Sequence, residues 1–189
     1  YENAYFFEGG KLVDGKDELV SDWGQYNTQS RKAAFFYNVR MRSNDDVIHT
    51  DTLFYDTRTS LAHVTGPSKI VSGDNVIHTA DGYFNSKTDL SQLFGRSTIV
   101  NKEKTITGDS LFHDNTTGLN EGFGNVVYKD TVNKNQLLCD HLSYNDKTGY
   151  GYATRKALMK DYSQQDTLYV HADTLKLYTF NIDTDSVYR

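Results

Sequence analysis

Short stretches of alternating apolar and polar residues return along this chain at a fixed interval. Residues 47–56 (Val-Ile-His-Thr-Asp-Thr-Leu-Phe-Tyr-Asp) align without a gap with residues 76–85 (Val-Ile-His-Thr-Ala-Asp-Gly-Tyr-Phe-Asn), an offset of 29 residues. Other copies close on an Asn or Asp at positions 27, 114 and 145, and a weaker sixth copy at 170–175 has Tyr178 in the closing position. A regular period of this length is typical of stacked repeat proteins.

Each copy predicts a strand, a turn and a second strand. The closing residue begins a polar turn, as in residues 56–59, and Asn, Asp and Gly suit such turns because they tolerate left-handed backbone and bond their own chain. Ten residues after the closing residue stands Gly66, Gly95 or Gly124, and a glycine within a strand pattern marks a bulge or bend. A helical repeat would need two amphipathic stretches per copy, and even the best helical candidate, residues 153–160, has no sustained apolar stripe. We therefore predict an all-β fold of stacked strand-turn-strand units.

Equivalent apolar residues should form columns, because a single 29-residue unit cannot bury a core alone. The first column consists of Leu19, Ile48, Ile77, Ile106 and Leu137. The second consists of Leu53, Leu111 and Leu142, and is thinned by Gly24 and Gly82. The columns lie at opposite strand parity, so either a bulge near the Asp of each copy or a sheet that is apolar on both faces is needed to reconcile them.

The amino-acid composition favours strands and argues against one class of partner. The 14 Tyr and 10 Phe favour sheets, and Pro67 is the only proline among 189 residues. The net charge is −5 and the basic residues are scattered, which argues against a nucleic-acid partner. No apolar run is long enough to cross a membrane as a helix, and the lone Cys139 rules out an internal disulfide. Because the chain begins and ends within a repeat, we expect residues 1–189 to be a single repeat domain from a longer protein.

Two sets of polar residues could carry chemistry, but a local role is favoured for both. His49 and His78 occupy one repeat position, with Asp51 and Asp81 nearby, and a repeat-position ladder explains them better than a metal site. A second set recurs as Asp22, Asp51, Asp109, Asp140 and Asp173. We expect these carboxylates to cap turns or to bond backbone amides at bulges. Known catalytic and nucleotide-binding motifs do not occur, so we predict no catalytic residue, no metal and no cofactor.

The recurring pattern, roughly Ile-x-Gly/Thr-Asp-x-Leu-x-Tyr-Asp/Asn, then Thr-Gly, then a Gly before Val-x-Val, resembles the organic-solvent-tolerance A (OstA-like) repeat family. That family includes the periplasmic lipopolysaccharide-transport protein LptA and the soluble domain of its outer-membrane partner LptD. The resemblance covers residues 4–178. It implies a twisted antiparallel β jelly roll, open along one side, that shelters the acyl chains of lipopolysaccharide in the periplasm. It also implies partners among other lipopolysaccharide-transport proteins, or further copies of the chain, joined end to end by strand pairing.

We therefore expect an apolar trough lined by both columns. The predicted lipid-binding residues are Leu19, Ile48, Ile77, Ile106 and Leu137, followed by Leu53, Leu111, Leu142, Phe54 and Phe112. Three alternatives stay open. A carbohydrate-active β-helix enzyme would show a polar cleft with converging carboxylates, a surface adhesin or spacer would expose aromatics such as Trp23, Tyr55 and Tyr144, and a closed core would have the same columns without a ligand.

Overall fold

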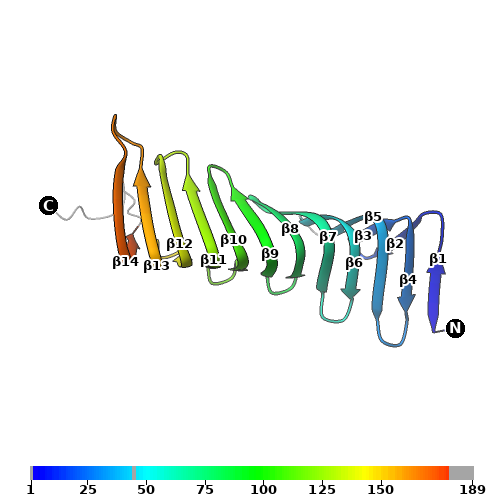
Figure 1. The fold of residues 1–189 in the computed structure, drawn as a ribbon. Coiled ribbons are helices and arrows are strands. Elements are labelled where there is room, and N and C mark those ends of the chain that lie inside the picture. The colour runs from blue at the N-terminus through cyan, green and yellow to red at the C-terminus, as the bar shows by residue number, and fades with distance from the viewer. Residues whose placement is uncertain (1, 44–45, 179–189) are drawn as a thin grey trace.

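The computed structural model describes residues 2–43 and 46–178, and all of its strands belong to one antiparallel sheet (Figure 1). The strands are β1 (Asn3–Phe6), β2 (Gly10–Asp14), β3 (Asp17–Ser21), β4 (Trp23–Asn27), β5 (Lys32–Ser43), β6 (Asp46–Asp56), β7 (Leu61–Ser72), β8 (Asn75–Asn85), β9 (Leu90–Asn101), β10 (Lys104–Asp114), β11 (Leu119–Asp130), β12 (Asn135–Asn145), β13 (Tyr150–Asp161) and β14 (Leu168–Tyr178).

The sheet is a simple meander. From β5 to β14 each strand pairs with the one before it, and β3 and β4 lie end to end along the other side of β5. β2 pairs with β3 and β1 with β4, so the first two positions of the sheet are each filled by two short strands. The result is a long, twisted ribbon that does not close on itself (Figure 1). The prediction of an all-β, open antiparallel sheet built from repeated strand pairs is confirmed.

Every long strand bends near its midpoint at a β-bulge. The pairing of β6 with β7 shifts between His49 and Thr52, so the bulge falls at Asp51. The facing strand passes the same point at Gly66, whose φ of 86° is a left-handed conformation that glycine adopts without strain. Shifts recur in every neighbouring pair, for example between Thr107 and Ser110 in β10. A bulge near each Asp was one of the two predicted ways to reconcile the columns, and it is confirmed.

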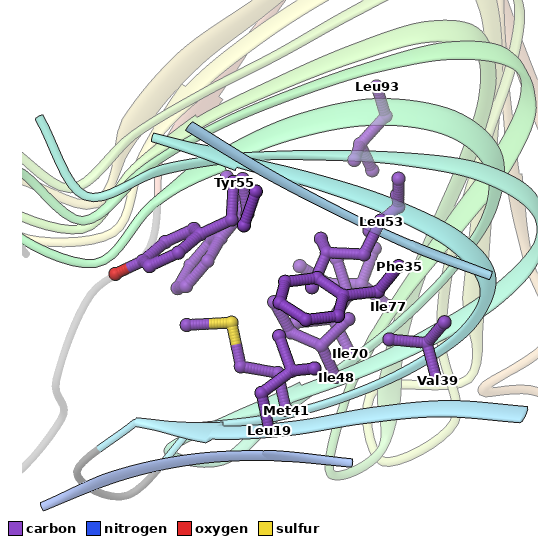
Figure 2. Close-up of a cluster of buried hydrophobic side chains, with 14 of the residues drawn as sticks. Leu19, Phe35, Val39, Met41, Ile48, Leu53, Tyr55, Ile70, Ile77 and Leu93 are labelled. Carbon is purple, nitrogen blue, oxygen red and sulfur yellow. The ribbon is translucent and has the colours of Figure 1, made fainter. Parts of the chain in front are cut away.

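The bends fold the sheet over, and the two halves of each strand face one another across a cluster of apolar side chains (Figure 2). We call the half that contains Ile48 and Ile77 the isoleucine half, and the half that contains Leu53 and Leu93 the leucine half. The space between them is the trough, and its open side, opposite the bends, is the mouth. Tyr55 lies toward the mouth in Figure 2.

Buried hydroxyl groups satisfy the backbone at the bends. Thr50 Oγ1 lies 2.7 Å from Ser68 Oγ, and Ser68 donates to the carbonyl of Gly66 at 2.8 Å. Thr79 and Ser97 repeat the arrangement one copy later, with 2.8 Å between their hydroxyl oxygens. A bulge interrupts the ladder, and a buried carbonyl left unpaired there would destabilise the fold. Thr and Ser therefore recur at this inward position for a structural reason.

The apolar interior consists of two clusters. One spans the sheet from Leu19 to Leu111, and the other contains Val126, Leu137, Cys139, Leu142, Ala153 and Ala157. They adjoin at β10 and β11, where two inward positions are occupied by Gly108 and Gly122. Partly buried Ile106 packs against both clusters.

Candidate functional site: the trough

Both predicted columns lie inside the trough. The buried members are Leu19, Ile48, Ile77 and Leu137 of the first column and Leu53, Leu111 and Leu142 of the second. Ile106 is only partly buried. The bulge at each Asp changes which residues point inward, so Ile48 and Leu53, five positions apart, share one face.

Phe54 and Phe112 lie elsewhere. Each follows an inward-facing leucine, and because side chains alternate along a strand both occupy the outer face of the leucine half. Phe54 is 42% exposed, whereas neighbouring Leu53 is fully buried. The structure therefore does not bring these two phenylalanines together with the other predicted residues.

The sequence predicted the second strand of each copy but did not assign its residues to the columns. Met41, Ile70 and Ile99 are paired in register with the first column, and the second is completed by Phe35, Val64, Leu93 and Ala153. The pairing between the two strands of a copy, which the repeat alignment does not give, decides this assignment. Side chains alternate along a strand, so residues two positions apart point the same way. Tyr55 and Phe84, which stand two residues after second-column positions, could therefore have been predicted to point inward.

The mouth is hollowed at the N-terminal end of the trough. A cavity of about 60 Å³ lies between Leu12, Leu19 and Met41 on one side and Tyr55, Thr57 and Ser60 on the other. A smaller one of about 10 Å³ separates Met41 and Ile48 from Tyr55, Ala62 and Phe84. Deeper in, the column residues fill the space with their own side chains. The accessible apolar surface of the trough is therefore at its mouth.

Aromatic rings form a continuous row on the outer face of the leucine half. Ring contacts connect, in order, Phe7, Trp23, Phe36, Phe54, His63, Tyr83 and Phe94, and a second group joins Phe123, His141 and Tyr152. The rings of His63 and Tyr83 stack at 4.2 Å with 10° between their planes, so they cover each other's faces. A hollow of about 400 Å³ beside this row is lined in part by Gln25, Ala34 and Phe54.

The rings of this row pack against one another as cross-strand pairs do, but Phe54 and Tyr83 are still 42% and 38% exposed, so the row keeps accessible aromatic surface on the outer face of the sheet. Of the three aromatics that the adhesin alternative named, Tyr55 is buried in the trough and Trp23 packs against Phe36 with 4.8 Å between ring centroids. Tyr144 lies two residues after buried Leu142 and shares its inward parity.

The carboxylates of the Asp series occupy the bulges, as predicted, but the bonds found there are to side chains. Asp22 Oδ2 accepts from Asn38 Nδ2 at 2.6 Å. Asp109 accepts from Asn125 at 2.7 Å and Arg96 at 3.0 Å, and these two donors lower the pKa of its carboxyl group. The carboxylates are thus engaged locally along the bend.

The histidine ladder is more widely spaced than the repeat suggested. In the register His49 pairs with Lys69, and Lys69 pairs with His78, so a lysine separates the two histidines. Asp81 bonds His63 at 2.9 Å. Within residues 2–43 and 46–178, no three His, Cys, Asp or Glu side chains are grouped as metal ligands. The same residues form no helix long and apolar enough to cross a membrane.

Comparison with known proteins places the chain in a family. The family model of OstA-like proteins matches residues 1–48 and 36–109, which together make up more than half of the chain. The chain belongs to the OstA-like family. Among solved structures, this OstA-like chain is similar to LptH, the LptA-homologous periplasmic component of the lipopolysaccharide transport device of Pseudomonas aeruginosa, at 11% identity and a TM-score of 0.46. The match covers 52% of this chain and 75% of LptH. No curated protein matches the sequence.

Proposed function

We propose that this OstA-like protein binds lipopolysaccharide without catalysing a reaction, holds its acyl chains between the two halves of the folded sheet, and takes part in its transport across the periplasm. The observation that carries the proposal is a sheet apolar on its inner face, folded over but open along one side, in a chain of the OstA-like family.

The trough offers the right chemistry for a sliding lipid. Burial of apolar surface contributes about 25 cal/mol per Å², or about 0.8 kcal/mol for each methylene that leaves water. The register repeats nearly the same apolar positions from Ile48 to Ile77 and Ile106. A chain that moves along such a row exchanges one apolar contact for a similar one, so no single position holds it strongly.

Lipid entry requires the two halves to separate slightly. The column residues are buried, so an acyl chain must displace some of their mutual contacts. The strand bends could absorb this movement, because in every second strand from β5 to β13 the bend contains residues with left-handed backbone, such as Gly66 and Gly95, that interrupt the regular ladder. A closed core, in contrast, would resist separation at every strand.

The open ends of the sheet support partners joined by strand pairing. Among the described residues, β1 and β2 each pair along one edge only. An exposed edge of this kind presents unpaired backbone donors and acceptors to a further strand. Other lipopolysaccharide-transport proteins or a second copy of this chain are the proposed partners, in the periplasm.

Photo-crosslinking tests the lipid site with a matched pair of neighbours. A benzophenone amino acid replaces either Tyr55, which points into the trough, or Phe54, which points outward from the same strand. With purified lipopolysaccharide, we expect crosslinks from position 55 and at least tenfold fewer from position 54. Equal yields, or none at 55 from a protein whose circular dichroism is unchanged, would contradict the proposal.

A further inference from the structure

The line of residues at the leucine-half lip of the mouth changes character along the sheet. In register it runs through Ala33, Tyr55, Ala62, Phe84, Ser91, His113, Asn120 and Tyr144. From β5 to β8 the line consists of alanine and aromatic residues, from β9 to β11 it consists of Ser91, His113 and Asn120, and in β12 to β14 it returns to Tyr144, Gly151 and Leu177. The positions are equivalent in the register, so the change comes from the side chains and not from a change in the fold.

The polar part is a hydrogen-bonded network. His113 Nδ1 lies 2.6 Å from Asn120 Oδ1, and His113 is 8% exposed. Asn120 Nδ2 donates to Asp146 Oδ2 at 2.8 Å and to the carbonyl of Gly118 at 3.1 Å. The network therefore joins β10, β11 and the turn after β12.

The opposite lip is polar along the sheet, in a line that runs through Ser72, Asn75, Asn101, Lys104 and Asp130, and at β11 a polar group also enters the first column. Tyr128 occupies the position that Ile99 and Ile106 hold in the two preceding strands. Burial raises the pKa of Tyr128, and the nearby Asp130, Tyr144 and Asp146 raise it further. Asp130, only 4% exposed, accepts bonds from the backbone amide and side chain of Asn133 at 2.9 and 2.8 Å. Polar groups thus occupy both lips and one column position around β9 to β11, whereas both mouth cavities lie at the N-terminal end.

From this contrast we infer that an acyl chain enters sideways between Met41 and Tyr55, lies across β5 to β8, and is stopped by the polar side chains of β9 to β11. This inference rests on the proposed function. An alkyl chain pushed further would separate His113, Asn120 and Tyr128 from their surroundings without offering a replacement hydrogen bond, which is unfavourable for buried polar groups.

The length of the apolar stretch suits one acyl chain. Four strands spaced about 4.8 Å apart span roughly 14 Å from β5 to β8. One leaflet of a bilayer's hydrocarbon core, half of about 30 Å, is roughly 15 Å deep. The apolar segment is therefore about as long as a single membrane acyl chain.

A crosslinking scan along one line of the register tests the boundary. The benzophenone amino acid is placed in turn at Tyr55, Phe84 and Tyr144, all on the leucine-half lip, and each protein is irradiated with purified lipopolysaccharide. We expect crosslinks at 55 and 84 and at least tenfold fewer at 144. Comparable yields at all three positions would overturn the boundary and leave the proposed function standing, whereas failure at all three would overturn the proposed function itself.

A double variant copied from the neighbouring repeat tests the cause. His113→Phe with Asn120→Ala installs the side chains found at equivalent positions of earlier copies, Phe84 one copy before and Ala62 two copies before. In this background we expect the crosslink at 144 to rise to within about threefold of that at 55. No rise in a variant that unfolds cooperatively in urea would show that the polar pair does not limit the lipid path. Should the double variant not fold, Asn120→Ala alone, which leaves His113 without its Asn120 partner, is expected to raise the crosslink at 144, and no rise would again contradict the inference.

Discussion

The closing Asn or Asp of each repeat acts through its side-chain oxygen at a single turn. Asp56 Oδ1 accepts from the amides of Arg58 and Thr59 at 3.0 and 3.2 Å, and Asn145 Oδ1 accepts from Lys147 and Thr148 at 3.0 Å each. Asp and Asn alternate freely between copies because both present an oxygen in the same place. Only the turns that begin with Asp, however, have a stability that depends on pH, because an Asn amide does not titrate.

Substitution of Asp114 by Asn should reduce the loss of stability that the protein suffers as the pH falls. The hydroxyl and amide of Thr117, with the amide of Thr116, lower the pKa of Asp114 below its ordinary value. A carboxyl group with a lowered folded-state pKa stabilises the fold above its unfolded-state pKa, near 4, and loses that contribution as pH falls through the folded-state value. We expect Asp114→Asn to match the wild type at pH 7 and to lose less stability between pH 4 and 2, measured as urea midpoints.

The control removes the same charge from another turn. Asp166→Asn, at an exposed position between β13 and β14, should lose as much stability between pH 4 and 2 as the wild type does. If the urea midpoint of Asp114→Asn also falls with pH as steeply as that of the wild type, the Thr116 and Thr117 contacts do not set the pH dependence.

Cys139 should resist alkylation in the folded protein. It occupies the inward bend position that Thr50 and Thr79 hold in earlier copies, and burial raises the pKa of its thiol to about 11. From an ordinary value near 9, this shift lowers the thiolate fraction at pH 8 about a hundredfold. We expect iodoacetamide to label native Cys139 at least a hundredfold more slowly than the urea-unfolded chain. Comparable rates would place the thiol at the surface.

At the scale of the strand, pairing with neighbours overrides local preference. Residues 153–160, which contain Ala, Leu, Met and Lys, were the best helical candidate in the sequence, yet they lie within β13. Their amides and carbonyls are shared with β12 and β14 on either side. Helix propensity is worth only fractions of a kcal/mol per residue, so pairing on both sides outweighs it, even though the bulge leaves Arg155 and Lys156 outside both registers.

The bulge glycines allow a graded test of bend geometry. Gly95 has a φ of 70° and open space where a Cβ would stand, so Gly95→Ala should cost only the left-handed backbone penalty of about 1 kcal/mol. Gly124 has the same φ, but a Cβ there would lie 2.7 Å from Asp109 Oδ2 and displace a carboxylate bound to Arg96 and Asn125. We expect Gly124→Ala to cost about 2 kcal/mol or more in urea unfolding.

Asparagine provides the comparison for both sites. Asn38 and Asn125 adopt left-handed backbone at other bulges, with φ of 52° and 47°. Gly95→Asn should therefore be milder than Gly95→Ala. Equal costs for alanine at 95 and 124 would mean that the contact with Asp109 does not matter.

At the scale of the whole molecule, each strand is stabilised mainly by its two sheet neighbours and by the side chains that face it across the trough. Stability in such a repeat is roughly a sum over units and their interfaces. The two ends of the ribbon therefore do not depend on each other for stability.

Removal of one complete repeat should be tolerated. Deletion of residues 57–85 removes β7 and β8 and joins Asp56 to Ser86, so Asp56 takes the place of Asn85 before the next turn. We expect a folded protein with an unchanged β-sheet circular dichroism band and a modestly lower urea midpoint. Deletion of residues 57–72, which removes β7 alone, should unfold the chain, because β8 would then run in the wrong direction beside β6.

Repetition made much of this fold predictable. The 29-residue period, the closing turns and the bulge glycines all depend on local backbone chemistry, which equivalent residues display in every copy. The same regularity identified Leu19, Ile48, Ile77, Leu53, Leu111 and Leu142 as interior residues. Phe54 and Phe112 could not be placed, because their side of the strand depends on where the bulge falls.

The sequence by itself thus determined that the chain is an all-β repeat with two apolar columns and a bend in each copy, since spacing and turn chemistry act over a few residues. Only the tertiary structure decided that the bends fold the sheet onto itself, that both columns share one interior, and that aromatic rings pack outside it. It alone showed that the leucine-half lip changes from apolar to polar at β9. These features depend on contacts between strands and across the trough, and a repeat pattern does not specify which faces meet.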